Sequence, residues 1–328
     1  MIEHCYRSHV GGAVADVRSA FKELCKAALP SAVWRGLKRV SGRDAKPVSD
    51  LRELDDLIRR ADEAFARSEE EGLRFLESFR FHWAGALPSD PYSTEYREAQ
   101  MALYRHVSGR GDYSLRNEYS SIDVDSALES PYPYNSRSPT ILGEYLISLG
   151  FLLKSLPLPS GARIVEFGAG WGHTTEMLVT LGFDVTAVEV DPGFVELLRR
   201  RLAGKGSWRV VETDMLSFEP ERPADAALFF EAFHHCADHL ALLEKLHRVV
   251  RPGGCLILAG EPIGEFEMPW GVRLDGQSVY SMRKHGWLEL GFEKAYFFDA
   301  LRRFGWSPRR LRSNLAPAAD VIIAQSSR

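Results

Sequence analysis

The sequence predicts an α/β protein with a doubly wound, mostly parallel sheet, preceded by an N-terminal helical region. Three observations carry this prediction. After residue 139, near-continuous apolar runs alternate with helical patterns, which is typical of parallel strands buried on both faces. At residues 164–173 a strand, a glycine-rich turn and a helix start follow one another. Residues 1–107 show only helical spacing of apolar side chains, so we expect a helical region over residues 1–130 and a second domain over residues 131–328.

Composition narrows the class of protein. The chain has 328 residues, of which 45% are hydrophobic and 26% charged, so we expect a sizeable core. The net charge of -4 gives no overall attraction to nucleic acid or to an anionic membrane. The four cysteines form no CxxC pair, which argues against a disulfide framework or a zinc site and fits a reducing compartment. No segment resembles a signal core or membrane span, so we expect a cytoplasmic protein without stable membrane insertion.

The first third of the chain carries no chemical motif. Helical spacing is expected over residues 12–30, from Asp50 to Phe79 with a break at Gly72, and over residues 94–107. We expect these helices either to cap the second domain or to contact a protein partner or a second copy. Residues 108–139 are rich in Gly, Ser, Asp, Pro and Tyr, so they should form a connection. Whether this connection closes over a ligand or packs the two parts together stays open.

The second domain should contain seven strands. They are expected at residues 161–167, 184–190, 208–211, 226–230, 255–259, 307–311 and 320–324. One helix is expected before the first strand, at residues 141–153, and the helices between strands are expected at residues 171–181, 192–202, 239–250 and 293–304. A short turn-like segment joins the last two strands, which favours an antiparallel pair, so the final strand should be reversed.

Acidic residues stand at or just after the ends of five successive strands. They are Glu166, Glu189, Asp214, Glu231 and Glu261. In an open α/β sheet, ligands bind outside the carboxyl ends of the strands. Buried carboxylates need solvent or hydrogen-bond donors, which a ligand rich in hydroxyl and amine groups supplies. The adjacent glycine turn removes the Cβ atoms that would block such a ligand, and the helix start adds free N–H groups.

Residues 139–328 resemble the class I S-adenosylmethionine-dependent methyltransferases. The family motif, an acid followed by G-x-G-x-G, matches the run from Glu166 through Gly168 and Gly170 to Gly172. The resemblance implies a Rossmann-like methyltransferase fold with a seven-stranded sheet. It also implies that the glycines lie against the methionine part of S-adenosyl-L-methionine and that Glu166 lies near its ammonium group.

Further family positions follow in order. The resemblance implies that Glu189 binds the ribose hydroxyls, that Asp214 accepts from the adenine amino group, and that Met215 packs beside the ring. Glu231 is a further cofactor-binding candidate, although it and Glu261 also suit acceptor binding or the orientation of a histidine. A nucleotide-type dehydrogenase, the close competitor, would need glycine at the position of His173.

The predicted function is methyl transfer to a small-molecule or saccharide acceptor, at a hydroxyl oxygen. His234 and His235 follow the fourth strand and are candidate bases, although each also suits a role as a loop brace. Residues 261–292 interleave aromatic and charged side chains and should recognise the acceptor. The sequence has neither a D-P-P-Y-like run nor a paired-aspartate magnesium site, so we predict no nucleic-acid substrate and no metal. A non-catalytic, methyltransferase-like binding or partner-recruiting protein is the alternative; a protein methyltransferase or NAD-dependent oxidoreductase fits less well.

Overall fold

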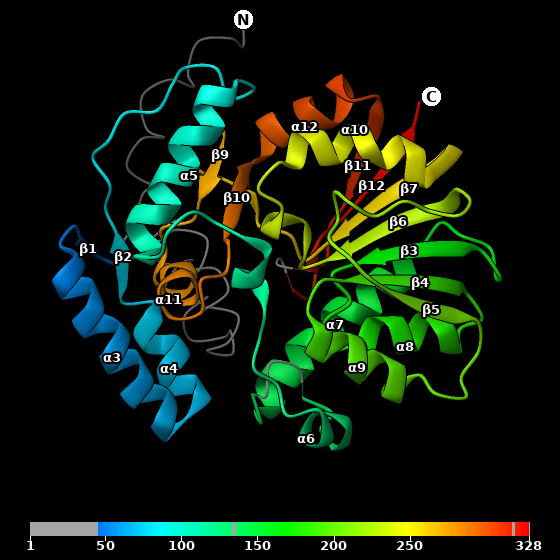
Figure 1. Ribbon diagram of the computed structural model, residues 1–328, viewed down its shortest axis with the longest axis horizontal. Coiled ribbons are helices and arrows are strands. Elements are labelled where there is room, and N and C mark those ends of the chain that lie inside the picture. The colour runs from blue at the N-terminus through cyan, green and yellow to red at the C-terminus, as the bar shows by residue number, and fades with distance from the viewer. Residues whose placement is uncertain (1–44, 133–135, 317–318, 328) are drawn as a thin grey trace, which may run out of the picture. The chain divides into compact units, whose positions relative to one another are not determined.

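A computed structural model describes residues 45–132, 136–316 and 319–327 of the chain (Figure 1). These residues belong to one compact unit, Asp44–Arg328. The helix that we expected over residues 12–30 lies outside the described residues.

Seven strands form the central sheet, in the order β11-β12-β7-β6-β3-β4-β5. Their bounds are β3 Arg163–Phe167, β4 Asp184–Glu189, β5 Trp208–Glu212, β6 Ala224–Phe230, β7 Val250–Ala259, β11 Trp306–Leu311 and β12 Val321–Ser326. Strand β12 runs antiparallel to both of its neighbours, whereas the other strands run in one direction. The predicted doubly wound, mostly parallel sheet with a reversed last strand is therefore confirmed.

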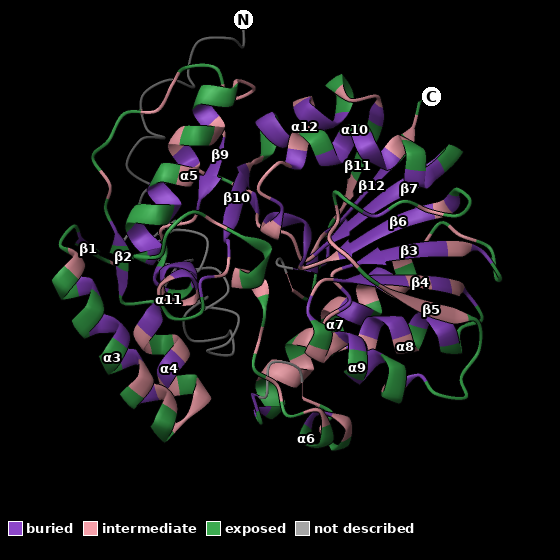
Figure 2. Ribbon diagram, viewed as in Figure 1, coloured by how far each residue is buried: buried purple, intermediate pink, exposed green. Residues whose placement is uncertain are grey.

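Helices cover both faces of this sheet, with α7, α8 and α9 on one face and α10 and α12 on the other (Figure 1). Their bounds are α7 Pro139–Ser155, α8 His173–Thr180, α9 Pro192–Arg201, α10 His239–Val249 and α12 Lys294–Arg303. Alternate strand residues enter different cores because side chains in a strand point to opposite faces. Phe167 and Phe229 pack with the α10 and α12 side, and Ile164 and Leu228 pack with α7 and α8. The inner strands are accordingly buried along most of their length, whereas the edge strands β5 and β11 are mostly half-buried or exposed (Figure 2).

The described N-terminal region is not all-helical, which corrects the sequence prediction. Its elements are β1 Lys46–Val48, α3 Leu51–Arg67, α4 Glu69–Leu76, β2 Phe79–Phe81 and α5 Thr94–Ser108. Strands β1 and β2 pair in parallel. Asp50 caps α3 as expected, but the helix breaks at Ser68, whose side chain caps α4. Gly72 lies inside α4 against the Phe65 ring, where a Cβ atom would approach to 2.2 Å. Close packing, rather than helix termination, thus explains this glycine.

The connection after α5 contains a 3₁₀ turn, η1 (Leu115–Glu118), and a short helix, α6 (Val124–Glu129). Helix α6 lies against α9, where the Arg201 guanidinium donates to the Ala127 carbonyl at 2.7 Å. The connection is therefore attached to the helical layer of the second domain.

A second, smaller sheet is formed by residues that lie between β7 and α12 in the sequence. It consists of β8 Ile263–Gly264, β10 Leu290–Glu293 and β9 Trp270–Val272, in that order, with α11 (Gly276–Lys284) between β9 and β10. This sheet contacts α5: the Tyr96 hydroxyl donates to the Trp270 carbonyl at 2.9 Å, and the Val272 N–H donates to the Gln100 side chain at 3.0 Å. The helical region thus packs on the segment that we expected to recognise the acceptor, and the boundary near residue 130 stays a prediction.

Replacing Trp270 with alanine should lower the free energy of unfolding by about 3–5 kcal/mol. The side chain is 2% exposed, and its indole N–H donates to the Pro91 carbonyl at 2.8 Å. Urea unfolding measures the change. Leu315, which is 81% exposed, provides the control, because Leu315→Ala should change stability by less than about 0.5 kcal/mol. A loss below about 1 kcal/mol for the Trp270 variant would contradict this packing.

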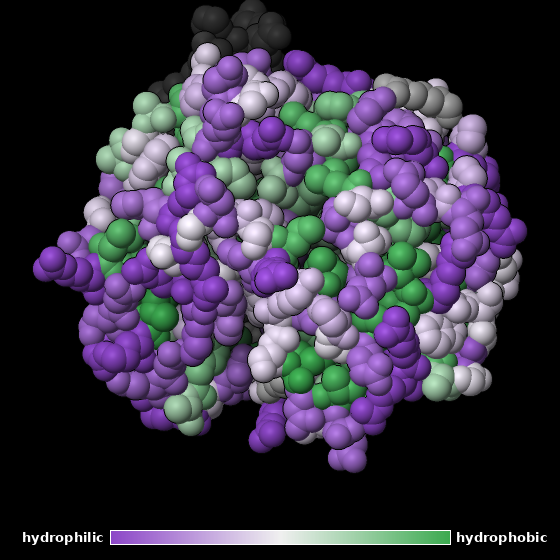
Figure 3. Space-filling model, viewed as in Figure 1, coloured by the Kyte–Doolittle hydropathy of each residue, from purple (hydrophilic) through white to green (hydrophobic). Residues whose placement is uncertain are grey.

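The face shown in Figure 3 is mostly hydrophilic, with some hydrophobic residues among the polar ones, as is usual for folded proteins. Within the described part of the chain, no helix combines the length and the apolar character that spanning a bilayer requires.

Candidate functional site

The glycine turn joins β3 to α8 in a backbone conformation that favours glycine. Gly168, Gly170 and Gly172 have φ values of 66°, 48° and 77°, all in the left-handed region. At Gly168 a Cβ atom would lie 2.7 Å from the Cβ of Ala232, so the turn lies directly beside the loop after β6. Gly172 is the N-cap of α8 and has no side chain to cap its N–H groups. The three glycines therefore present a backbone without side chains at the carboxyl edge of the sheet, and the first N–H groups of α8 have no side-chain cap.

Glu166 lies on β3 with its side chain on the α8 face. It is 2% exposed and accepts a hydrogen bond from the Thr175 hydroxyl at 2.6 Å. Burial raises the pKa of Glu166 to about 7; the Thr175 bond lowers it, and the nearby Glu189 raises it further. Near neutral pH this carboxyl group therefore holds its proton about half of the time, and a cation placed beside it would remove that proton.

The raised pKa of Glu166 should make folding stability depend on pH. The unfolded chain loses this proton near pH 4.5 and the folded chain near pH 7. The contribution of protonated Glu166 to the free energy of unfolding is therefore complete below pH 4.5 and is lost as pH rises through 7. Between pH 4.5 and about pH 8, the parent should lose about 3 kcal/mol relative to Glu166→Gln, which has no proton to lose. Urea unfolding across this range measures the difference. Parallel profiles for parent and variant would refute the prediction.

Glu189 ends β4 and is 6% exposed. Its carboxylate accepts from the Gly170 N–H at 2.8 Å, and from the N–H groups of Val190 at 2.8 Å and Asp191 at 3.0 Å. Burial raises the pKa of Glu189, and these three backbone donors offset part of the increase. The Glu189 carboxylate thereby joins the end of β4 to the glycine turn.

Asp214 and Met215 follow β5. The Asp214 carboxylate accepts from the N–H groups of Leu216 at 2.8 Å and Ser217 at 3.0 Å, which fixes the turn. The Met215 methyl carbon lies 3.6 Å from the point where a Gly168 Cβ would stand. The structure therefore brings both residues to the same sheet edge as the glycine turn.

Glu231 is the first residue after β6 and has a φ of 54°, a region that residues other than glycine rarely adopt. Its N–H donates to the Ala259 carbonyl at 2.9 Å. Its side chain packs on Gly260, where a Cβ atom would come within 2.6 Å of the Glu231 Cγ. This turn directs the chain from the sheet edge into the loop that carries the two histidines.

His234 and Glu261 form a buried pair beside that loop. The Glu261 carboxylate, 1% exposed, accepts from the N–H groups of Ala232 and Phe233 and lies 2.8 Å from the Nδ1 atom of His234. Burial opposes ionisation, but His234 and the backbone donors outweigh it and hold the pKa of Glu261 below its usual range. An ionised Glu261 orders the imidazole with Nδ1 protonated, which leaves Nε2 as the basic nitrogen.

His235 faces a different carboxylate. Its Nδ1 atom lies 3.3 Å from an oxygen of Glu118, which belongs to η1. Burial alone would lower the pKa of His235, but Glu118, followed by Glu289 and Glu261, raises it to about 9. The Tyr113 hydroxyl donates to the His235 carbonyl at 3.3 Å, and the Leu288 N–H donates to Glu118 at 2.9 Å. The connection after α5 thus contributes side chains to this site.

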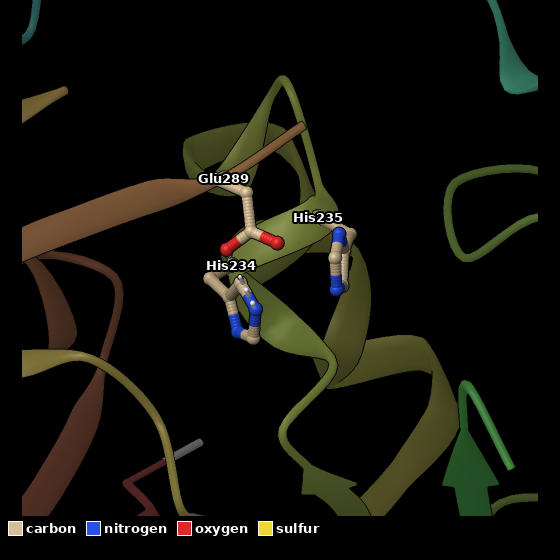
Figure 4. A group of neighbouring side chains, drawn as sticks. All are labelled: His234, His235 and Glu289. Carbon is tan, nitrogen blue, oxygen red and sulfur yellow. Dashed lines mark ion pairs between the residues drawn. The ribbon is translucent and has the colours of Figure 1, made fainter. Parts of the chain in front are cut away.

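The two imidazole rings lie side by side, with centroids 4.2 Å apart, and the Glu289 carboxylate points toward them (Figure 4). Sequence reasoning missed Glu118 and Glu289. A signal existed for Glu289, because it is a single acid between Leu288 and Leu290, both fully buried. Glu118 lies in a turn-rich segment among other polar residues and carries no such signal.

Part of the chain is similar in sequence to known methyltransferases. Residues 165–258 match a family described as "Methyltransferase domain". A trans-aconitate 2-methyltransferase of Methylobacterium nodulans is 36% identical over 107 residues, which are 32% of this chain and 40% of that protein. A ubiquinone biosynthesis O-methyltransferase of Xylella fastidiosa is 29% identical over 116 residues, which are 34% of this chain and 47% of that protein. The chain thus spans about half or less of these two relatives. A solved S-adenosylmethionine-dependent methyltransferase from Aquifex aeolicus aligns with a TM-score of 0.45 at 17% identity, covering 62% of this chain and 99% of that one.

Proposed function

Because residues 165–258 form a class I S-adenosylmethionine-dependent methyltransferase domain, we propose that the protein transfers the methyl group of S-adenosyl-L-methionine to a hydroxyl oxygen of a small-molecule or saccharide acceptor. The observation that carries the proposal is the His234–Glu261 pair, which lies one loop away from the glycine turn. The names of the relatives, a trans-aconitate methyltransferase and an O-methyltransferase of ubiquinone biosynthesis, support a small-molecule acceptor.

The carboxyl edge of β3, β4 and β5 is the proposed cofactor site. The glycine turn receives the methionine part, and Glu166 attracts its ammonium group. Glu189 accepts from the ribose hydroxyls, Asp214 accepts from the adenine amino group, and Met215 packs on the ring. Glu231 borders the cofactor where the chain turns toward the histidines. The burial of Glu166 and Glu189 supports these roles, because a buried carboxylate is stabilised by hydrogen-bond donors rather than by bulk water.

The proposed chemistry is an in-line displacement. The acceptor oxygen attacks the methyl carbon, the carbon–sulfur bond breaks with its electron pair going to sulfur, and S-adenosylhomocysteine leaves. The hydroxyl proton passes to Nε2 of His234, and the Glu261 carboxylate stabilises the imidazolium that forms. The protein's other contribution is to hold the three reacting atoms in line and to exclude water. His235 is the second candidate base, and its contact with Glu118 favours a positioning role.

The described part of the N-terminal region, residues 45–130, is proposed to complete the acceptor site rather than to act as an independent recruiting module. Its Glu118 contacts His235, and its α5 packs on the small sheet at Trp270. A chain that begins at residue 131 would lack both contacts.

The proposed function is tested by incubating the purified protein with methyl-labelled S-adenosylmethionine and fractionated cell extract. We expect the label in a fraction of small metabolites or glycans, bound through oxygen. Label found only on protein side chains would overturn the proposed acceptor class. Cofactor binding without transfer to any fraction would favour a non-catalytic binding protein.

A further inference from the structure

His234, His235 and Glu289 point toward one another from two different loops (Figure 4). Each of the three offers a nitrogen or oxygen atom, and these atoms all lie within 4.8 Å of one another. His234 and His235 follow β6, and Glu289 precedes β10. Residues distant in sequence thus meet at one point on the acceptor side of the site.

Glu289 and His235 both have unused bonding capacity. The Glu289 residue is 9% exposed, and its carboxylate lies 3.8 Å from Nε2 of His234 and 3.6 Å from a guanidinium nitrogen of Arg273. Within the described residues it accepts no hydrogen bond through that carboxylate. The Nδ1 atom of His235 is buried and forms no hydrogen bond of good geometry within the described residues, although a Glu118 oxygen lies 3.3 Å away. The Glu289 carboxylate therefore keeps lone pairs that a further ligand can use, beside its long ion pairs with His234 and Arg273.

The chemistry of the three atoms selects the kind of ligand. Two imidazole nitrogens and one carboxylate oxygen all offer lone pairs once His235 has lost its second proton, so a metal ion that displaces this proton is bound by all three at once. Zinc and similar transition metals accept this mixed nitrogen and oxygen set, whereas magnesium and calcium prefer oxygen alone. Tetrahedral ligands of zinc are separated by about 3.3 Å, so the present atoms would need to approach by about 1 Å or somewhat more.

The surroundings also favour a cation. Glu261 binds Nδ1 of His234, which is the contact that typically orients a metal-binding histidine and leaves its other nitrogen available. Glu118 lies beside His235, so three carboxylates surround the two rings. Arg273, which lies 3.6 Å from Glu289, pairs with Asp275 at 3.1 Å. A dication would offset this excess of negative charge.

We propose that His234, His235 and Glu289 bind one divalent transition-metal ion, best matched by zinc, and that this ion inhibits methyl transfer. The sequence predicted no metal site, and this proposal departs from that prediction because Glu289 could not be placed beforehand. The inhibition rests on the proposed function: a metal-bound Nε2 of His234 has no lone pair left to accept the proton of the acceptor. The metal-bound and the catalytic forms are then alternative states of one nitrogen.

Titration calorimetry of the metal-stripped full chain with zinc tests the binding, and cobalt absorption spectra test the ligand set. We expect one ion per chain, bound at least tenfold more weakly by each of His234→Ala, His235→Ala and Glu289→Gln. His82 is exposed, so His82→Gln should bind like the parent. Glu289→Gln keeps the shape of the side chain, and its binding of S-adenosylmethionine reports that it is folded. Absence of stoichiometric binding, or equal binding by all three variants, would overturn the site.

Measuring methyl transfer in the presence of zinc separates the proposed metal site from the proposed function. Zinc should slow label transfer by the parent, and a chelator should restore it. Zinc binding with undiminished transfer would contradict the inhibition and would remove His234 as the base, while the metal site itself would stand. Transfer without any zinc binding would overturn the metal site alone.

Discussion

Replacing His234 with alanine is expected to lower kcat by a factor of about 10² to 10⁴, the usual contribution of a general base. The reason is that Nε2 of His234 is the basic nitrogen of a ring fixed by Glu261 at 2.8 Å. The affinity for S-adenosylmethionine should stay within about twofold of the parent, because the ring lies outside the proposed cofactor site. Steady-state kinetics in chelator-treated buffer, with calorimetry of cofactor binding, measure both quantities.

The neighbouring histidine gives the matched comparison for His234. His235→Ala should cost less than His234→Ala in kcat, because His235 is held by Glu118 and is assigned a positioning role. The kcat of Glu261→Gln should lie between those of the two histidine variants. This substitution keeps the ring in place but removes the charge that stabilises the imidazolium. A kcat for His234→Ala within threefold of the parent would exclude this residue as the base.

The second large effect is expected at Glu189. Glu189→Ala should weaken S-adenosylmethionine binding about 100-fold or more, because two hydrogen bonds from ribose hydroxyls to a charged carboxylate contribute about 1.5–3 kcal/mol each. The variant also removes the acceptor of the Gly170 N–H, so the glycine turn loses a support. Calorimetric titration with S-adenosylmethionine and S-adenosylhomocysteine measures the loss.

Glu212 is the control for Glu189, because the two residues pair in register on neighbouring strands. Glu212 is exposed and takes no part in the proposed site, so Glu212→Ala should bind the cofactor like the parent. Equal losses in both variants would mean that the effect reflects general charge at the sheet edge. No loss in Glu189→Ala would remove this residue from the cofactor site.

The seven-stranded sheet could be predicted from sequence because its signals are local. The apolar strands, the helix starts and the glycine turn each depend on residues that are adjacent in the chain, and the topology of a parallel sheet then brings the strand ends to one edge. Glu166, Glu189 and Asp214 accordingly lie at or near the ends of β3, β4 and β5, and their roles in cofactor binding stay predictions. The reversed β12 followed from the short turn before it.

The missed features depend on contacts between distant segments. Glu118 reaches His235 across 117 positions of sequence, and Glu289 reaches His234 across 55, so no local pattern reports either contact. The small sheet of β8, β9 and β10 has strands of two to four residues, too short for a reliable period. Gly72 was misread because a glycine that permits close packing against Phe65 has the same signature as one that ends a helix.

The most direct measurement is calorimetric titration of the parent protein with S-adenosylmethionine and its demethylated product. We predict measurable heat with both, one molecule per chain, reduced in Glu189→Ala and in Asp214→Ala. If neither compound gives heat with the folded parent, and both variants behave like it, then the carboxyl edge beside the glycine turn is not a cofactor site.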